Sequence, residues 1–235
     1  MTTFQYDPDI LARYPDLRAG IVIAQGITND PSSRKLINEY LTEQGYTLNR
    51  IAGTALSEIE PLAAWRGAFR AFGVNPTKYR SAPEALLRRL TKKGDIPSIN
   101  TLVDICNLVS IRYAIAVAAF DTSALQGAVT VRFADGSERY TPLGVSEVET
   151  PEPGEVIFTD DSGLVIARRW CWRQSDDSAA RENTQNVIIT VEAQHANCQP
   201  DVEAALSDVL ELLNAHVAGS FYDDLLGPDN PKISN

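Results

Sequence analysis

The order of helix-like and strand-like patterns is the feature that most constrains the fold of this chain. After one short apolar run at residues 17–25, helical periodicity dominates to about residue 112. Short β-branched runs then dominate to about residue 192, and a last amphipathic helix is predicted over residues 201–216. Helices followed by strands are typical of the α+β class. We therefore expect a mixed or antiparallel sheet covered by helices.

Capping and stop signals set the expected element boundaries. Ser57 precedes Glu60 and Ser81 precedes Glu84 by three residues, which is the spacing of a capping box, and Gly45 is expected to end the first long helix. Helices are predicted over residues 32–44, 57–73, 98–112 and 201–216, with a further helix starting at residue 81. Strands are predicted at residues 17–25, 115–120, 128–133, 155–159, 164–172 and 186–192.

No Gly/Ser-rich or Pro-rich linker divides the 235 residues, which are enough to bury a full core. We therefore expect a single domain over residues 1–219. The polar residues 220–235 are expected to form a tail, with its last part frayed.

Positive charge is concentrated in one segment of an acidic protein. Residues 66–93 hold eight basic residues against one acidic residue, a local charge of +7, whereas the whole chain carries −10. The remaining residues therefore carry −17. A basic segment of this kind favours a local site for a polyanion or a phosphate-bearing ligand. The competing interpretation is a solvated helical face.

Two colinear motifs resemble a known family. Residues 99–127 carry Asp104, Asn107, Val109, the Phe120–Asp121 pair and Gly127, and residues 182–187 form a second match. Both are similar to the B3/B4 domain of the bacterial phenylalanyl-tRNA synthetase beta subunit, the module that edits mischarged tRNA. The similarity covers about residues 65–193, with no region resembling the other synthetase domains. The chain thus resembles a free-standing B3/B4 domain protein with the B3/B4 fold.

One departure from the family pattern lies in the first motif. Two residues before the Phe120–Asp121 pair, where the family has a histidine of the editing pocket, this chain has Ala118. Neither His195 nor His216 replaces it by motif. Either the hydrolytic site is built differently here or the activity has been lost.

The resemblance implies hydrolysis of an aminoacyl ester by a positioned water, with no covalent nucleophile. Asn107 is the candidate for holding the substrate amine or carbonyl, and Thr184 and Asp176 complete the candidate catalytic set. Asp176 lies close to an acidic position of the family pattern. The alternatives are a structural hydrogen bond for Asn107 and a cap at a strand entry for Thr184.

Candidate contacts to substrate or tRNA come from four regions of the sequence. Residues 168–173 alternate arginines with aromatic or thiol side chains along a predicted strand, so a tryptophan is expected to stack on the terminal adenine while arginines bind phosphate. The alternative is a buried tryptophan pair with salt-bridged arginines. The full candidate set is Tyr79, Arg80, Ser81, Glu84, Arg88, Arg89, Asp104, Trp172, Arg173 and Asn186.

The expected partner is the acceptor end of tRNA or an aminoacyl-adenosine-like ligand. No metal or other cofactor is expected, because His195 and Cys198 lack a second ligand pair. The three cysteines suit a reducing compartment, and no secretory signal or membrane span is evident, so a cytoplasmic location is expected. Three functions compete: an aminoacyl-tRNA deacylase, a non-catalytic module that binds tRNA or an amino acid, and a small-molecule enzyme that reuses the pocket.

Overall fold

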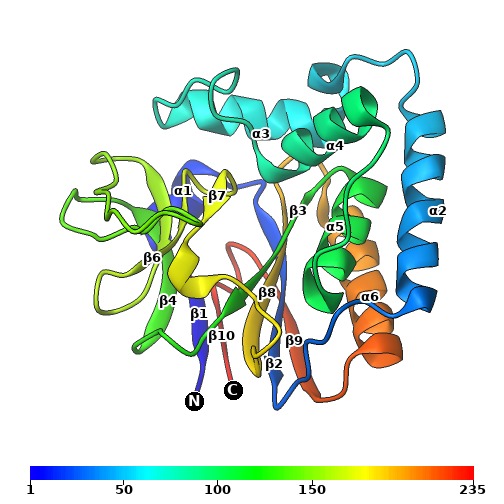
Figure 1. Cartoon of the computed structure of the whole chain (residues 1–235). Coiled ribbons are helices and arrows are strands. Elements are labelled where there is room, and N and C mark those ends of the chain that lie inside the picture. Colours follow the sequence, from blue (N-terminus) through cyan, green and yellow to red (C-terminus); the bar gives the residue numbers. More distant parts are fainter.

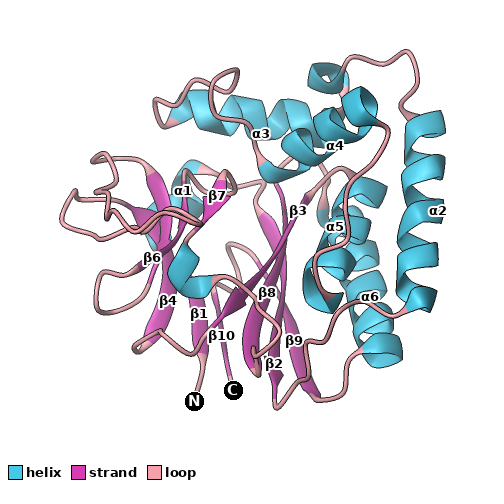
Figure 2. Cartoon of the chain, in the orientation of Figure 1, coloured by secondary structure: helices cyan, strands magenta, loops and turns pink.

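Two sheets and one main layer of helices make up the structure (Figures 1 and 2). The computed structural model describes all 235 residues. The helices are α1 (Pro8–Arg13), α2 (Arg34–Arg50), α3 (Glu60–Ala71), α4 (Ala82–Lys93), α5 (Thr101–Tyr113) and α6 (Gln199–His216), with short 3₁₀ turns at Leu56–Glu58 and Asp176–Ser178. The strands are β1 (Thr3–Tyr6), β2 (Arg18–Gln25), β3 (Ala116–Asp121), β4 (Ala128–Phe133), β5 (Val156–Thr159), β6 (Val165–Arg168), β7 (Arg173–Gln174), β8 (Asn186–Ala193), β9 (Ser220–Leu226) and β10 (Lys232–Ser234). None of the helices combines the length and apolarity needed to cross a membrane.

The four-stranded sheet forms the centre of the molecule. Its order is β3-β8-β2-β9, and every neighbouring pair is antiparallel. Helices α5 and α6 cover one face of it, and α2 packs against α5 (Figure 1). Side chains alternate between the faces, so Val22 and Ala24 of β2 pack in the helix-facing core while Ile21 and Ile23 pack in the core on the other side.

The second sheet has six strands in the order β10-β1-β4-β5-β6-β7. It is mixed, because β1 pairs with β4 in parallel and with β10 antiparallel. The core that it shares with the four-stranded sheet includes Phe4, Phe158 and Trp170, together with Trp65 and Phe69 of α3. The expected α+β class with mixed and antiparallel strands is confirmed, with two sheets where the sequence pattern suggested one.

Two predicted helix boundaries are wrong. Gly45 does not end the first long helix, because α2 continues to Arg50 and buries Gln44 and Thr47 beside and beyond it. The Gln44 amide exchanges two hydrogen bonds with the backbone of Ile96, so tertiary contacts outweigh the weak helix preference of one glycine. Ser57 lies in a 3₁₀ turn, and α3 begins after Ile59 with no side-chain cap.

The predicted capping box at the start of α4 is also wrong. Ser81 is the N-cap residue, but its buried hydroxyl makes no capping bond. The Glu84 carboxylate instead binds Arg66, with Nη1 2.8 Å from Oε1, and lies 3.8 Å from Nε of Arg80. The start of α4 is held by the amide of Ala82, which donates to the Cys171 carbonyl oxygen at 2.7 Å.

The C-terminal residues are not a frayed tail, and the boundary predicted at residue 219 does not separate them from the domain. Strand β9 pairs with β2 over seven residues, and β10 pairs with β1. The amide of Thr2 also donates to the carbonyl oxygen of Asn235, so the two ends of the chain lie side by side (Figure 1).

Candidate functional site

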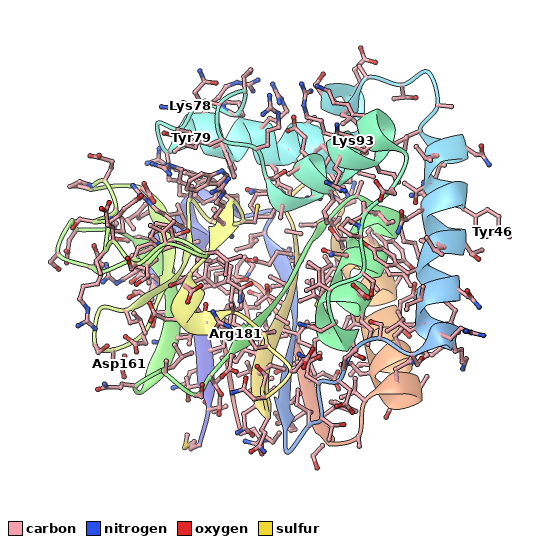
Figure 3. The ribbon with its side chains drawn as sticks, in the orientation of Figure 1. Tyr46, Lys78, Tyr79, Lys93, Asp161 and Arg181 are labelled. Carbon is pink, nitrogen blue, oxygen red and sulfur yellow. The ribbon has the colours of Figure 1, made fainter.

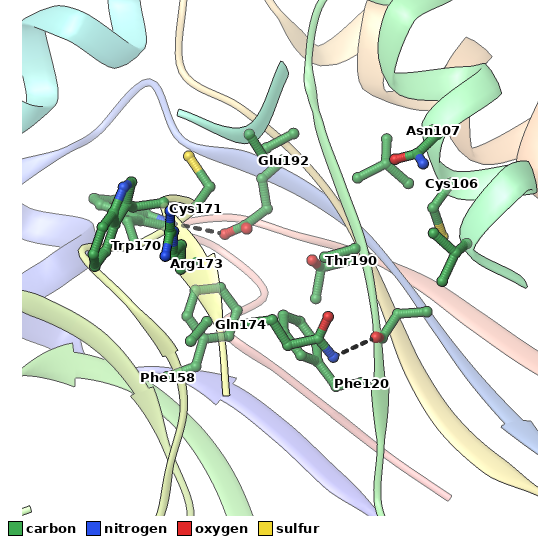
Figure 4. A pocket seen from close by; sticks show the side chains of 18 residues that line it. Cys106, Asn107, Phe120, Phe158, Trp170, Cys171, Arg173, Gln174, Thr190 and Glu192 are labelled. Atoms are coloured by element: carbon green, nitrogen blue, oxygen red, sulfur yellow. Dashed lines mark hydrogen bonds between the residues drawn. The ribbon is translucent and has the colours of Figure 1, made fainter. Parts of the chain in front are cut away.

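A pocket of about 180 Å³ lies between the two sheets, close to α4 and α5 (Figure 4). Thirteen of its 18 lining residues are hydrophobic, so it suits an apolar group. Asn107 of α5 and Cys171 of the β6–β7 connection lie on opposite sides of it in the close-up (Figure 4). The lining also includes Phe120, Phe158, Trp170, Trp172, Arg173, Gln174, Thr190 and Glu192.

Small side chains on β3 give the pocket its volume. Ala116 lies directly opposite Glu192 on β8, and Ala118 lies opposite Thr190. Directly opposed residues of an antiparallel pair project from the same face, so both alanines leave space in front of the two polar side chains of β8. The residue at the family's histidine position therefore faces the pocket rather than the helix-side core.

Glu192 is a buried carboxylate in this apolar lining. Its Oε1 accepts hydrogen bonds from the Tyr6 hydroxyl at 2.7 Å and from the Trp170 indole N–H at 3.0 Å. It forms no salt bridge, and its Oε2 accepts no hydrogen bond from the protein. Burial raises the pKa of Glu192 to about 7, against the opposing effect of the two hydrogen bonds. The carboxyl therefore exchanges its proton near neutral pH.

The connection between β6 and β7 departs from the predicted continuous strand. Arg169 and Trp170 have φ angles of 48° and 57°, a left-handed conformation that is uncommon for bulky residues. The turn buries Trp170 completely, with its ring 5.2 Å from that of Trp65, while Trp172 stays partly exposed. The predicted alternation of faces along residues 168–173 is thus wrong.

The two predicted roles for this segment are divided among its residues. Arg168 is buried and salt-bridged to Glu155, with Nε 2.6 Å from Oε1, as the structural interpretation expected. The guanidinium carbon of Arg169 lies 4.0 Å from the Tyr79 ring centre and 4.6 Å from that of Trp172. Tyr79, Arg169, Trp172 and Arg173 thus form a cation–aromatic rim beside the pocket.

A basic depression of about 460 Å³ adjoins this rim. No acidic residue lines it, and it shares Trp172 and Arg173 with the apolar pocket. Lys78 and Lys93 lie at separate points along the α3–α4 side of the molecule (Figure 3). The cationic residues that line the basic depression are Lys78, Arg80, Arg88, Arg89, Lys92, Lys93 and Arg173. A concave surface of one charge sign raises the local concentration of anions.

Six of the predicted site residues line either the apolar pocket or the basic depression. Asn107, Trp172 and Arg173 line the pocket, and Arg80, Arg88 and Arg89 line the basic depression. Tyr79 lies at the rim through its contact with Trp172. The structure thus brings helix α5, the β6–β7 connection and the basic segment together.

The remaining predicted residues lie outside the pocket, and the side chains of all but Ser81 have hydrogen-bond or salt-bridge partners. Asp104 is fully buried and accepts hydrogen bonds from the hydroxyls of Ser32 and Ser98 and from the amide of Ile99. It therefore anchors the segment before α5 and does not share an exposed surface with Asn107. Ser81 and Glu84 lie at the start of α4, where both are buried.

Thr184, Asp176 and Asn186 are likewise engaged in loop contacts. Thr184 is buried and donates to the Asp121 carboxylate, and its hydroxyl accepts from the Arg181 amide at 2.9 Å. The Asp176 carboxylate accepts from the Gly144 amide at 3.0 Å, and this bond lowers its pKa. The side-chain oxygen of Asn186 accepts from the amide of Gly26. None of the three lines the pocket.

Three polar lining residues were not predicted from the sequence. Glu192 and Thr190 belong to a predicted strand, and a charged residue in a run as apolar as residues 187–193 was the available signal. The Gln174 amide N–H groups bind the carbonyl oxygens of Ala119 and Ser178, which fixes β7 against β3 (Figure 4).

Comparison with known proteins gives a consistent family relationship. The B3/4 domain family model matches residues 64–199, more than half of the chain. Phenylalanine–tRNA ligase beta subunits from Fusobacterium nucleatum and Streptomyces avermitilis are each 36% identical, over 119 and 107 residues. These matches cover 50% and 45% of this chain but only 14% and 12% of the relatives' own lengths. The Shewanella oneidensis beta subunit is 28% identical over 116 residues, which are 49% of this chain and 14% of that subunit.

A solved structure was also found to be similar. It is an N-terminal fragment of the phenylalanyl-tRNA synthetase beta subunit from Pyrococcus horikoshii, with a TM-score of 0.49 and 13% sequence identity. The alignment covers 95% of this chain and 54% of that fragment.

Proposed function

This chain belongs to the B3/4 domain family, and we propose that its pocket binds the aminoacyl end of a tRNA and hydrolyses the ester bond. The observation that carries the proposal is the junction of two unlike surfaces, because the apolar pocket and the basic depression share Trp172 and Arg173. An aminoacylated RNA end has two matching parts, an amino acid side chain at one end and phosphates at the other. The relatives' role in charging tRNA supports RNA as the partner.

The size of the pocket supports an amino acid side chain as the buried group. A protein cavity of roughly 150 Å³ accommodates a benzene molecule, and this pocket measures about 180 Å³. Ala116 and Ala118 make that space, and Phe120 and Phe158 give it an apolar wall. Trp172 at the rim offers a surface against which a nucleobase stacks, and Arg173 beside it offers a charge for phosphate.

The proposed hydrolysis uses water and the polar groups of the pocket. The Glu192 carboxylate accepts a proton from a water molecule, and the water oxygen attacks the ester carbon. The Asn107 amide donates to the carbonyl oxygen as it gains charge. The tetrahedral carbon then expels the ribose oxygen, which takes the proton held by Glu192, so the amino acid leaves as the free acid and the carboxylate is restored. Burial raises the pKa of Cys171 well above its usual value and that of Cys106 to about 12, so both remain thiols and are poor nucleophiles.

Ala118 favours one alternative, a module that binds the aminoacyl end without cleaving it. With a methyl group where the family has an imidazole, the pocket lacks that second proton-transfer group. In this alternative the free Oε2 of Glu192 accepts a hydrogen bond from the bound amino acid. The two functions share the same binding site and differ only in whether the ester is cleaved.

The deciding experiment measures cleavage and binding separately. Purified protein is incubated with a panel of misacylated tRNAs, and ester loss is compared with that of the same tRNAs alone. Binding is measured with tRNA whose amino acid is attached through a stable amide. Ester loss that rises with pH around 7 and is abolished in Glu192→Gln supports the deacylase.

Other outcomes are equally decisive. Binding of the amide-linked tRNA without ester loss, together with hydrolysis gained in Ala118→His, assigns the protein to the binding module. Failure to bind any aminoacylated tRNA refutes both functions.

A further inference from the structure

A second basic depression of about 340 Å³ lies beside the first, on a neighbouring face of α4. Its cations are Arg66, Arg80, Arg88 and Lys92. The hydroxyl residues Ser57, Thr77 and Thr91 also line it. Against these four cations stands one carboxylate, that of Glu84, so the depression has a formal charge of +3.

The geometry of α4 makes the two depressions continuous. Successive residues of a helix are about 100° apart around its axis. Glu84 and Thr91 therefore lie on one side, and Arg89 and Lys93 lie on another. Arg88 and Lys92 fall between them and line both depressions, as does Arg80 just before the helix.

The second depression is held in place by buried contacts. Glu84 is only 4% exposed, and both its oxygens accept from Nη1 of Arg66, at 2.8 and 3.1 Å. Arg66 also lies within 3.4 Å of the Thr77 hydroxyl, and Arg80 approaches Glu84 at 3.8 Å. The buried carboxylate thus fixes two guanidinium groups before a ligand arrives, so less side-chain entropy is lost on binding.

We propose that this second depression binds phosphate groups of the RNA chain that lie upstream of the nucleotide at the pocket. The inference rests on the proposed function and adds the path of the backbone, which crosses α4 over Arg88 and Lys92. Arginine, lysine and hydroxyl side chains are the groups that commonly contact nucleic-acid phosphates. The residues outside 66–93 carry a net charge of −17, which disfavours an RNA contact spread over the whole surface.

Thr91 provides a specific test, because it is exposed and lines only the second depression. Thr91→Glu places a negative charge there, and Thr91→Gln is the neutral control of matched size. The first probe is adenosine with a 3′-amide-linked amino acid and no phosphate. The second carries the same group on a trinucleotide with a 5′ phosphate. Dissociation constants are measured by competition in fluorescence anisotropy at several salt concentrations.

We expect Thr91→Glu to weaken trinucleotide binding about 5-fold or more relative to Thr91→Gln, because like charges repel across the depression. The slope of its salt dependence should fall by about 0.7 for each phosphate that the variant no longer neutralises. Adenosine-probe binding should stay within about 2-fold. Unchanged thermal unfolding of both variants establishes that the fold is intact.

Three results would overturn the inference, and each has a different meaning. If the adenosine probe binds but the trinucleotide binds equally to both Thr91 variants, the backbone takes another path and the proposed function stands. If inorganic pyrophosphate alone binds as tightly as the trinucleotide and is equally sensitive to Thr91→Glu, the depression is a site for free phosphates. If neither aminoacylated probe binds the wild-type protein, the proposed function itself fails.

Discussion

Replacing Glu192 with glutamine should make the protein's stability less dependent on pH. The pKa of this carboxyl rises from 4.5 when exposed to about 7 in the fold. The folded chain therefore holds the proton more tightly than the unfolded chain does. The resulting stabilisation is present below pH 4.5 and is lost as the pH rises through 7. At about 1.4 kcal/mol per pKa unit, the ionised carboxylate costs about 3 kcal/mol above pH 7.

The assay is urea unfolding followed by tryptophan fluorescence between about pH 5 and pH 8. Over this interval Glu192 should lower the free energy of unfolding of the wild type by about 2 to 3 kcal/mol. Glutamine keeps a side-chain oxygen for the Tyr6 and Trp170 donors but does not ionise, so Glu192→Gln should lack this decrease. Glu211 is exposed, and Glu211→Gln removes one carboxyl group just as Glu192→Gln does, so it serves as the control.

Parallel pH profiles for the wild type and Glu192→Gln, measured against the Glu211→Gln control, would refute the reasoning. They would mean that water or a nearby cation solvates the Glu192 carboxylate in the fold. The proposed role of this residue as a proton acceptor near neutral pH would then lose its physical basis.

Three further predictions concern binding and catalysis. Asn107→Ala should reduce the hydrolysis rate about 10-fold or more, equivalent to about 1.4 kcal/mol in the activation barrier. The free energy of unfolding should change little, because Asn107 is only half-buried. A rate within twofold of the wild type would remove Asn107 from the site. The triple change of Arg80, Arg88 and Arg89 to alanine should weaken tRNA binding and reduce its salt dependence; an unchanged salt dependence would assign these arginines to internal salt bridges. Deacylation should survive treatment with a chelator, and loss of activity that added zinc restores would contradict this.

Local signals predicted the elements whose packing agrees with their own sequence preferences. Residues 128–133 form the predicted strand, and the helix predicted from residue 32 begins at Arg34, after Ser33, whose hydroxyl accepts from the Leu36 amide. In these segments, short-range preferences and tertiary contacts favour the same structure.

The predictions failed where distant contacts decided the conformation. Residues 220–226 were predicted as part of a polar tail, but they include Phe221, Tyr222, Leu225 and Leu226 and form a strand on the edge that β2 offers. Arg169 and Trp170 adopt left-handed angles because the turn carries Trp170 into the core beside Trp65. The motif-based site included Thr184, whose hydroxyl is occupied by Asp121. The motifs therefore pointed to Asn107, which lines the pocket, but also to Thr184, which does not.

The pocket depends on residues outside the segment that matches the family. Within residues 64–199, the four-stranded sheet has only β3 and β8, and its other two strands are β2 and β9. Strand β2 pairs with β8 over eight residues, and β1 supplies the Tyr6 hydroxyl that binds Glu192. Without these strands, β8 loses a neighbour and Glu192 loses one of its two hydrogen-bond donors. The orientation of the carboxylate is therefore set jointly by the matched segment, through Trp170, and by the N-terminal strand that precedes it.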